Sequence, residues 1–505
     1  MLDKQWKKLQ NGSDVRGVAL EGIEGQPVNL TCDIASQIAK AFVCWLSDKL
    51  SKSPESIKIA VGCDSRISSK PLLNAVADAI IASGADVIDC GMASTPAMYM
   101  TLVTDGYCYD GSVMITASHL PFNRNGLKFF IKSGGLEHED ITEILQIAQD
   151  GNFPIFNKIG TRTSLDFISV YAKGLCDKII KATGEQKPLS GLKIIVDAGN
   201  GAGGFFASKV LEPLGADTTG SQFLDPDGHF PNHIPNPEDP DAMDSIRDAV
   251  LNSKADLGLI FDTDVDRVGA VDNMGREINR NRLIALISAI AIEEHPGTCI
   301  VTDSVTSSGL KIFIESLGGI HYRYRRGYKN VINKGIELNN SGTDCQVAIE
   351  TSGHAALKEN YFLDDGAYLA VKLIIKMAQL VKEGKQLSSI IETLQEPKEA
   401  GEFRLTINTE DFKPYGQKLI DELEQYAKSQ KGWTIADDNR EGIRVSFNKD
   451  DGDGWFLLRL SLHDPVIPIN IESNIEGGLK TIANKLYNFV KQYDKLDLSA
   501  FEKAI

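Results

Sequence analysis

The sequence lacks the cysteine pattern of a disulfide framework or a zinc site. Its eight cysteines are scattered and form no CxxC pair. Several lie in apolar runs, such as Cys299 beside Ile300, so we expect reduced thiols in hydrophobic cores. The first residues, MLDKQWKKLQ, lack an apolar segment, and we therefore expect no secretory signal and a cytoplasmic protein.

Long hydrophobic runs and excess positive charge are also missing. The longest apolar run, residues 283–292, is about half of what a bilayer span requires, so we expect no membrane segment. The formal net charge is -16, which argues against a nucleic-acid or anionic-membrane partner. A cleft can still be locally basic inside an acidic protein, so a small anionic substrate remains possible.

A chain of 505 residues is too long for one core and should form several domains of ~100–200 residues each. Three segments repeat one pattern, in which a β-branched run ends in Asp, a helical stretch ends in glycine, and further strands follow. The repeats begin at residues 57–64, 192–197 and 298–303. Nearly wholly apolar strands that alternate with helices predict three related α/β domains with buried parallel sheets.

The pattern changes after about Gly401. Residues 403–407 and 455–460 predict strands, and residues 474–493 predict an amphipathic helix, which together favour an α+β domain with an antiparallel sheet. Residues 395–402, which include Pro397, are the predicted linker. We therefore predict domains at 1–160, 161–274, 275–395 and 396–505, the first three with mixed, mainly parallel sheets, arranged around a central cleft.

A polar loop follows the third strand of each repeat. These loops are Thr116–His119, Asp262–Arg267 and Glu350–His354. Ligands of open α/β sheets bind outside the carboxyl ends of the strands, so the three loops are expected to line a shared cleft.

The first loop carries Ser118 and is followed by Lys128, which we place on a glycine-hinged loop. A hydroxyl at the end of a strand is a candidate phosphoryl acceptor, and Lys128 could act as general acid or base. The alternative is an ordinary strand-to-loop corner with a structural hydroxyl and a surface lysine.

The second loop, DTDVDR, is the strongest signal. Its three carboxylates, Asp262, Asp264 and Asp266, repel one another strongly without a cation. All-oxygen ligands favour Mg²⁺ before Ca²⁺, and Arg267 could hold an anionic group beside the metal. A solvated acidic turn is the alternative, but a buried strand precedes the loop directly.

Three further stretches suit a sugar phosphate. The third loop, ETSGH, offers donors and acceptors for sugar hydroxyls. Residues 325–329 (RRGYK) place three cations around one glycine, which indicates anion recognition. Arg459 and Ser461 follow a predicted strand and could clamp a phosphate together with backbone N–H groups.

Taken together, these motifs resemble those of the α-D-phosphohexomutase superfamily, the phosphomannomutase/phosphoglucomutase group, in order and over nearly the whole chain. The resemblance rests on residues 11–17 (NGSDVRG), 62–66 (GCDSR), 116–121 (TASHLP), 125–128 (NGLK), 262–267 (DTDVDR), 327–331 (GYKNV), 350–354 (ETSGH) and 459–465 (RLSLHDP).

The resemblance implies a role for each matching residue. Ser118 would be the phosphoserine and would ligate Mg²⁺ with Asp262, Asp264 and Asp266. Lys128 would be the general acid/base, with Arg16 and His119 close to the phosphoserine. The implied substrate-binding residues are Lys329, Glu350, Ser352, His354, Arg267, Arg459, Ser461 and His463.

Two positions depart from the family pattern. Leu120 stands where the family usually has Asn, and Leu462-His463-Asp464 replaces the usual Gly-Thr-Glu. The segment Lys358–Gly366 is similar to that of mannose and glucose mutases, not of glucosamine mutases.

The function implied is that of an isomerase, a phosphoprotein of carbohydrate metabolism, that interconverts hexose 6-phosphate and hexose 1-phosphate of mannose or glucose. Mg²⁺ and a hexose 1,6-bisphosphate, as activator and intermediate, are the expected cofactors, and the protein is expected to be a monomer or homodimer. The alternatives are a glucosamine-phosphate mutase, a Mg-dependent sugar phosphatase with Asp262 as nucleophile, and an inactive sugar-phosphate-binding homologue.

Overall fold

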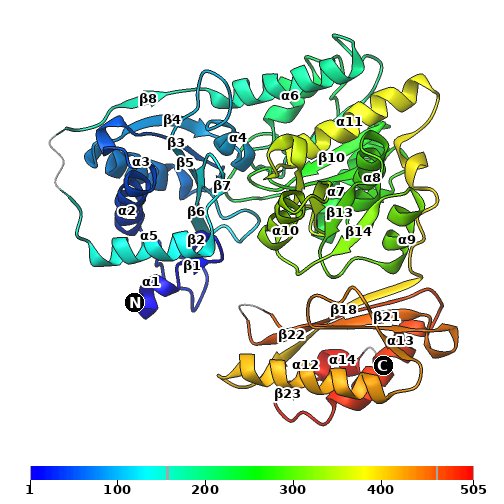
Figure 1. Cartoon of the computed structure of the whole chain (residues 1–505). Coiled ribbons are helices and arrows are strands. Elements are labelled where there is room, and N and C mark those ends of the chain that lie inside the picture. The colour runs from blue at the N-terminus through cyan, green and yellow to red at the C-terminus, as the bar shows by residue number, and fades with distance from the viewer. Residues whose placement is uncertain (1, 155–157, 462–463, 504–505) are drawn as a thin grey trace. The chain divides into compact units, whose positions relative to one another are not determined.

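The computed structural model describes residues 2–154, 158–461 and 464–503 (Figure 1). The chain packs into two compact units, residues 1–279 with 352–387 and residues 280–351 with 388–505. Within the described ranges, no helix combines the length and the apolar character that crossing a bilayer requires.

The first unit begins with a mixed sheet in the order β1-β2-β6-β5-β3-β4-β8, with β7 paired to β6. Strands β4, β3 and β5 run parallel, whereas β6 and β2 are antiparallel additions beside β5. The strands are β1 (Gln10–Asn11), β2 (Asp14–Val18), β3 (Lys58–Cys63), β4 (Asp86–Met92), β5 (Gly111–Ile115), β6 (Arg124–Ile131), β7 (Gly134–Gly135) and β8 (Arg162–Ser164), and the helices are α1 (Lys4–Lys7), α2 (Cys32–Leu50), α3 (Ser69–Ala82), α4 (Thr95–Met100), α5 (His138–Asp150) and α6 (Phe167–Thr183).

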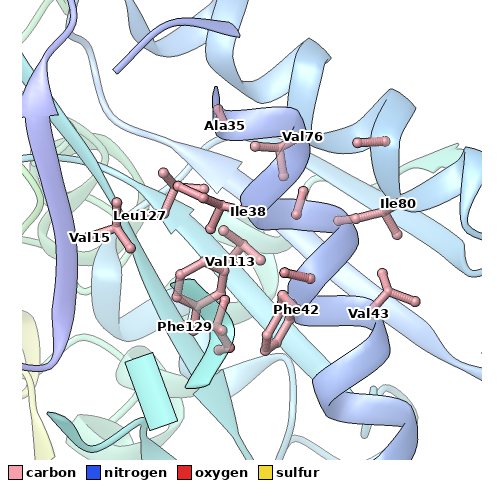
Figure 2. Close-up of a cluster of buried hydrophobic side chains, with 14 of the residues drawn as sticks. Val15, Ala35, Ile38, Phe42, Val43, Val76, Ile80, Val113, Leu127 and Phe129 are labelled. Atoms are coloured by element: carbon pink, nitrogen blue, oxygen red, sulfur yellow. The ribbon is translucent and has the colours of Figure 1, made fainter. Parts of the chain in front are cut away.

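Helix α2 forms the centre of the first core. The Thr31 side chain accepts a hydrogen bond from the backbone N–H of Ile34 and caps its start. Its apolar positions recur three and four residues apart, so they form one stripe, and Ile38 and Phe42 are fully buried. Figure 2 shows this stripe against the side chains of the sheet, where the rings of Phe42 and Phe129 lie 4.7 Å apart.

The second sheet of this unit has the order β12-β11-β10-β9. Strand β10 runs parallel to β9 and antiparallel to β11, so the loop between β10 and β11 leaves the carboxyl end of a buried strand. The elements here are β9 (Ile194–Asp197), η2 (Phe206–Leu211), α7 (Pro240–Ser253), β10 (Leu257–Phe261), β11 (Val268–Asp272) and β12 (Glu277–Ile278), and the later segment of the unit adds β16 (Ala355–Leu357), β17 (Leu363–Asp364) and α11 (Gly366–Lys382).

The second unit contains a parallel trio, in which β13 lies between β14 and β15, and a C-terminal antiparallel sheet in the order β19-β20-β21-β22-β18-β23. The first part comprises α8 (Asn281–Glu294), β13 (Cys299–Thr302), α9 (Ser308–Ser316), β14 (Ile320–Arg323), α10 (Tyr328–Asn340) and β15 (Cys345–Ile349). The second part comprises β18 (Glu399–Ile407), α12 (Phe412–Ser429), β19 (Trp433–Ile435), β20 (Ile443–Phe447), β21 (Gly454–Leu458), β22 (Val466–Ser473), α13 (Gly478–Val490), β23 (Leu496–Asp497) and α14 (Ser499–Glu502).

The predicted α/β class with a C-terminal antiparallel sheet is confirmed. The predicted linker is wrong in part, because β18 begins at Glu399 and pairs with β22 along its length. Pro397 and Gly401 suggested a loop, but the sheet hydrogen bonds outweigh that local signal. The four domain limits stay a prediction.

Lys128 was also placed wrongly by its sequence context, since it lies within β6 opposite Met114 and not on a loop. The preceding Asn125-Gly126 pair looks like a turn. Instead, the Asn125 amide donates to the hydroxyls of Ser68 and Ser69. A Cβ on Gly126 would lie 2.3 Å from the carbonyl oxygen of Val15, so this glycine permits a close approach of two strands.

The core around α2 yields a first prediction. Replacing Phe42 by Ala removes a fully buried ring and should lower the free energy of unfolding of this core by about 3–5 kcal/mol. Native-state hydrogen exchange of α2 measures the loss. Gln37→Ala, at an exposed position of the same helix, is the matched control and should change it by less than about 0.5 kcal/mol; equal losses would contradict the packing described.

Candidate active site

Ser118 lies three residues after the end of β5, where the backbone turns sharply. Its φ of 51° lies in the left-handed region, which non-glycine residues adopt at a cost. The Thr116 hydroxyl accepts a hydrogen bond from the Ser118 N–H at 2.9 Å and supports the turn. The result is a buried hydroxyl whose Oγ donates to Asp262 Oδ2 at 2.9 Å.

Arg66 holds the loop that carries Ser118. Its buried guanidinium donates to the backbone carbonyls of Ser118 and Leu120 and to those of Pro121 and Arg124. Burial lowers the pKa of Arg66, and Asp64, 3.3 Å away, opposes that shift. Because Leu120 contributes its backbone carbonyl to this clamp, the family's Asn can be replaced there without loss of the contact.

Three carboxylates gather beside the serine. Asp262, Asp264 and Asp266 are all buried, and one oxygen of each lies within 4.8 Å of the others. Burial and the neighbouring carboxylates raise the pKa values of Asp262 and Asp264. The Thr95 hydroxyl donates to Asp264. The three carboxylates predicted from the sequence therefore lie together on one tight turn.

Asp266 carries its negative charge most readily. Burial would raise its pKa, but Lys128, His354 and Arg267 outweigh burial and lower it. Lys128 Nζ lies 3.2 Å from Asp266 and 3.6 Å from Asp14, to which Arg16 also donates at 3.1 Å. The lysine and the arginine predicted from sequence therefore share one carboxylate partner, Asp14.

Arg267 connects the carboxylates to the serine loop. Its guanidinium lies 3.3 Å from Asp262 and 3.4 Å from Ser118 Oγ, and Nη2 donates to His119 Nδ1 at 2.6 Å. Burial and Arg267 lower the pKa of His119 to about 2. His119 is therefore neutral, accepts at Nδ1, and supports the serine loop without acting as a base.

His354 contacts the same cluster from the later segment of the first unit. Its Nδ1 hydrogen-bonds Asp364 and lies 4.0 Å from Asp266. Burial lowers the pKa of His354, but Asp364 and Asp266 outweigh it and the net shift is upward. The imidazolium is thereby favoured, which places a further positive charge beside the carboxylates.

The carboxylate cluster fits a divalent cation. Asp264 Oδ1 and Asp266 Oδ1 are buried, and neither accepts a hydrogen bond from any described residue. Buried carboxylate oxygens without donors are costly, and a hard cation with oxygen ligands would remove that cost. Asp262, Asp264 and Asp266, with Ser118 beside them, are the residues that would hold it.

The other predicted substrate-binding residues are divided between the two units. Ser352 belongs to the first unit, whereas the second unit holds Lys329, Glu350, Arg459 and Ser461. Glu350 accepts a hydrogen bond from Gly327 N–H at 2.6 Å, so the GYKN and ETSGH motifs meet at that point. Ser461 Oγ accepts from Asp464 N–H at 3.3 Å. The predicted His463 lies outside the described residues.

Several residues of the cluster were not predicted as site residues. Asp14 binds Lys128 and Arg16, Thr95 binds Asp264, and Asp364 binds His354. The motif GCDSR pointed to Arg66, because it resembles a motif of the family, but the sequence analysis assigned no role to this arginine. Asp14 lies two residues before Arg16 in a matched motif, but nothing local shows that its partner is 114 residues away along the chain, at Lys128.

Fold and site together define an α/β protein with a buried serine against a cluster of metal-binding carboxylates. Family models match three regions, each described as a Phosphoglucomutase/phosphomannomutase alpha/beta/alpha domain: domain I at residues 7–154, domain II at 169–275 and domain III at 279–397.

Proteins of similar sequence and a similar solved structure carry the names of the same family. A phosphomannomutase/phosphoglucomutase of Pseudomonas aeruginosa is 30% identical, with 95% of this chain and 96% of that protein covered. A phosphoglucomutase/phosphomannomutase of Thermococcus kodakarensis is 31% identical, with 93% and 95% covered. The crystal structure of a family protein from Burkholderia thailandensis has a TM-score of 0.79 at 27% identity, covering 97% and 98%. The chain belongs to the phosphoglucomutase/phosphomannomutase family, within the α-D-phosphohexomutase superfamily.

The carboxylate cluster yields a second prediction. Replacing Asp264 by Asn removes one ligand charge and should weaken Mg²⁺ binding by about ten- to a hundredfold, as measured by isothermal titration calorimetry. Added Mg²⁺ should raise the melting temperature of the native protein, because a ligand that binds only the folded state stabilises it, and should raise that of the variant less. Asp248→Asn, at an exposed position on α7, should bind Mg²⁺ like the native protein. Equal affinity in all three proteins would place the metal elsewhere.

Proposed function

We infer that this chain is a phosphohexomutase, an isomerase that interconverts hexose 6-phosphate and hexose 1-phosphate, and we propose mannose and glucose as its hexoses. The observation that carries the proposal is the hydrogen bond from Ser118 Oγ to Asp262 at the edge of the carboxylate cluster. Family membership supports it, as do the relatives named for phosphomannose and phosphoglucose chemistry.

In the first half of the reaction, the phosphoryl group passes from Ser118 to a hydroxyl of the bound sugar phosphate. The bond between phosphorus and Ser118 Oγ breaks, and a bond to the substrate oxygen forms. Lys128 accepts the hydroxyl proton, for which its amine must be neutral. The product is a hexose 1,6-bisphosphate, the proposed intermediate and activator.

Positive charge around Ser118 stabilises the oxygen that leaves. Arg267 Nη2 lies 3.4 Å from Ser118 Oγ, so the guanidinium is already in place where negative charge develops. Mg²⁺ bound to the three carboxylates would supply further charge neutralisation for phosphoryl transfer.

The second half reverses these roles after the bisphosphate turns around. Ser118 Oγ attacks the other phosphate, and Lys128 returns its proton to the departing substrate oxygen. The carboxylates of Asp266 and Asp14, at 3.2 and 3.6 Å from Nζ, hold the lysine side chain in position for this transfer. After both halves, Ser118 again carries a phosphoryl group and the Lys128 amine is again neutral.

Recognition of the sugar phosphate is assigned to the remaining motifs. Glu350, Ser352 and His354 would contact hydroxyls, with Lys329 and Arg267 near the charged groups. Arg459 and Ser461, with His463, would bind the phosphate that does not react. Because phosphate binds bidentately to guanidinium groups, Arg459 is the residue expected to contribute most.

A sugar phosphatase with Asp262 as nucleophile is the second candidate. Asp262 does lie on a loop after a buried strand, as that chemistry requires. However, its carboxylate already accepts hydrogen bonds from Ser118 and Arg267, which reduces its nucleophilicity and points to a supporting role.

A third prediction tests Ser118. Ser118→Ala removes the phosphoryl carrier and should abolish mutase turnover of glucose 1-phosphate and mannose 1-phosphate, assayed with Mg²⁺ and catalytic bisphosphate. Ser65→Ala, at a nearby hydroxyl whose Oγ is buried without a described hydrogen-bond partner, should keep at least about half of the activity. Substantial turnover by Ser118→Ala would remove Ser118 from the mechanism, and equal inactivity of the native protein would favour a homologue that only binds.

A fourth prediction separates mutase from phosphatase. Incubation with ³²P-labelled hexose bisphosphate should label the native protein, and the label should survive acid, because a phosphoserine ester is stable there whereas an aspartyl phosphate is hydrolysed. Peptide mapping should place it on Ser118. An acid-labile label that hydroxylamine releases, mapped to Asp262, would instead establish the phosphatase chemistry.

A further inference from the structure

A cavity of about 270 Å³ opens in the first unit between α6, the end of α4 and the turn at Asn360–Tyr361. Its walls include none of the candidate active-site residues. They are mainly apolar, with the side chains of Met100, Val103, Val170 and Leu175 and the rings of Tyr171 and Tyr361. A concave apolar site with a few polar groups is the usual form of a small-molecule site.

Lys178 places a cation in this wall. Its ammonium lies 4.6 Å from the ring centroid of Tyr368 and forms no ion pair with any described residue. The two nearby carboxylates are already used, since Glu359 pairs with Lys372 at 2.9 Å and Asp365 accepts from Tyr171 at 2.6 Å. Burial lowers the pKa of Lys178. Glu359 and Asp365 oppose that shift only in part. A half-buried ammonium that is held in no ion pair attracts an anion more strongly than an exposed one does.

Asn360 supplies an acceptor that has no donor. The residue is only 1% exposed, and its Nδ2 donates to Asp365 Oδ2 at 2.9 Å. Its carbonyl oxygen Oδ1 is buried and accepts no hydrogen bond from any described residue. Leaving a buried carbonyl without a donor costs about 1–3 kcal/mol, so a ligand would gain from donating to Oδ1 once a small side-chain shift turned this oxygen into the cavity.

We propose that this cavity binds a small aromatic or branched monocarboxylate that also carries a hydroxyl or amino group. The carboxylate pairs with Lys178, the donor group reaches Asn360 Oδ1, and the apolar body lies between Val170 and Leu175. Asp105, also in the wall, is exposed, and its negative charge disfavours a dianion such as a phosphate ester. The site is therefore distinct in chemistry from a sugar-phosphate site.

The test uses 4-hydroxybenzoate as probe and isothermal titration calorimetry on the full chain. Gly174→Leu fills the cavity from α6, where a Cβ would meet no atom within 4 Å, and Lys178→Met removes the charge. The matched control is Lys173→Met, on the same helix, where the lysine pairs with Asp177 at 2.5 Å outside the cavity wall. Melting temperatures of all variants check folding.

Saturable binding is expected to the native protein and to Lys173→Met, and both cavity variants should weaken it at least about tenfold. The neutral analogue 4-hydroxybenzamide should bind at least about tenfold more weakly than 4-hydroxybenzoate, since it lacks the charge that pairs with Lys178. No saturable binding to the native protein, or equal binding by native, Gly174→Leu and Lys178→Met proteins, would overturn the proposal. Mutase activity does not enter this test, so its result is independent of the proposed function.

Discussion

The arrangement of side chains around Ser118 in the first unit depends on one constraint, which is that buried charges must be compensated. Asp262, Asp264 and Asp266 have lost nearly all contact with water, and carboxylates in such surroundings are stable only when cations and hydrogen-bond donors compensate them. Arg267 and Lys128 provide much of the compensation. Two of their oxygens accept no hydrogen bond from the described residues, which makes the cluster suited to a metal ion.

Strained backbone also occurs at this place, and elements distant in sequence hold it. Val265, a β-branched residue within the acidic turn, has a φ of 66°, a conformation that costs of order 1–3 kcal/mol. Its carbonyl accepts from the N–H of Gly366, at the start of α11, at 3.1 Å. Asp365 caps that helix by accepting from Tyr368 N–H. The acidic turn is therefore fixed from α11, as the serine loop is fixed by Arg66.

Sequence reasoning found the residues whose role is expressed locally. Three alternating carboxylates after an apolar strand, and a serine at the end of another, are patterns within a few positions. The structure brings these residues together, and their roles stay a prediction. Sequence reasoning failed where a residue that looked like a turn residue is instead required by a contact between distant segments. Gly126 looked like a turn because glycine favours turns, but it serves a close approach of β6 to β2, and so Lys128 was assigned to a loop. Arg66, Thr95 and Asp14 act through partners far away in sequence, which one sequence alone does not reveal.

The two departures from the family pattern have different consequences. At Leu120 the interaction that matters comes from the backbone, so the side chain is free to vary. In the second unit the altered loop follows Arg459, whose Nη1 lies 4.0 Å from Glu441 and whose buried Nε finds no acceptor among the described residues. Burial lowers the pKa of this arginine, and Glu441 only partly compensates. A guanidinium that retains an unused donor in a desolvated position gains more from a phosphate than an exposed one would. The phosphate recognition proposed for this loop is therefore expected to depend on Arg459 more than on the residues that replace Gly-Thr-Glu.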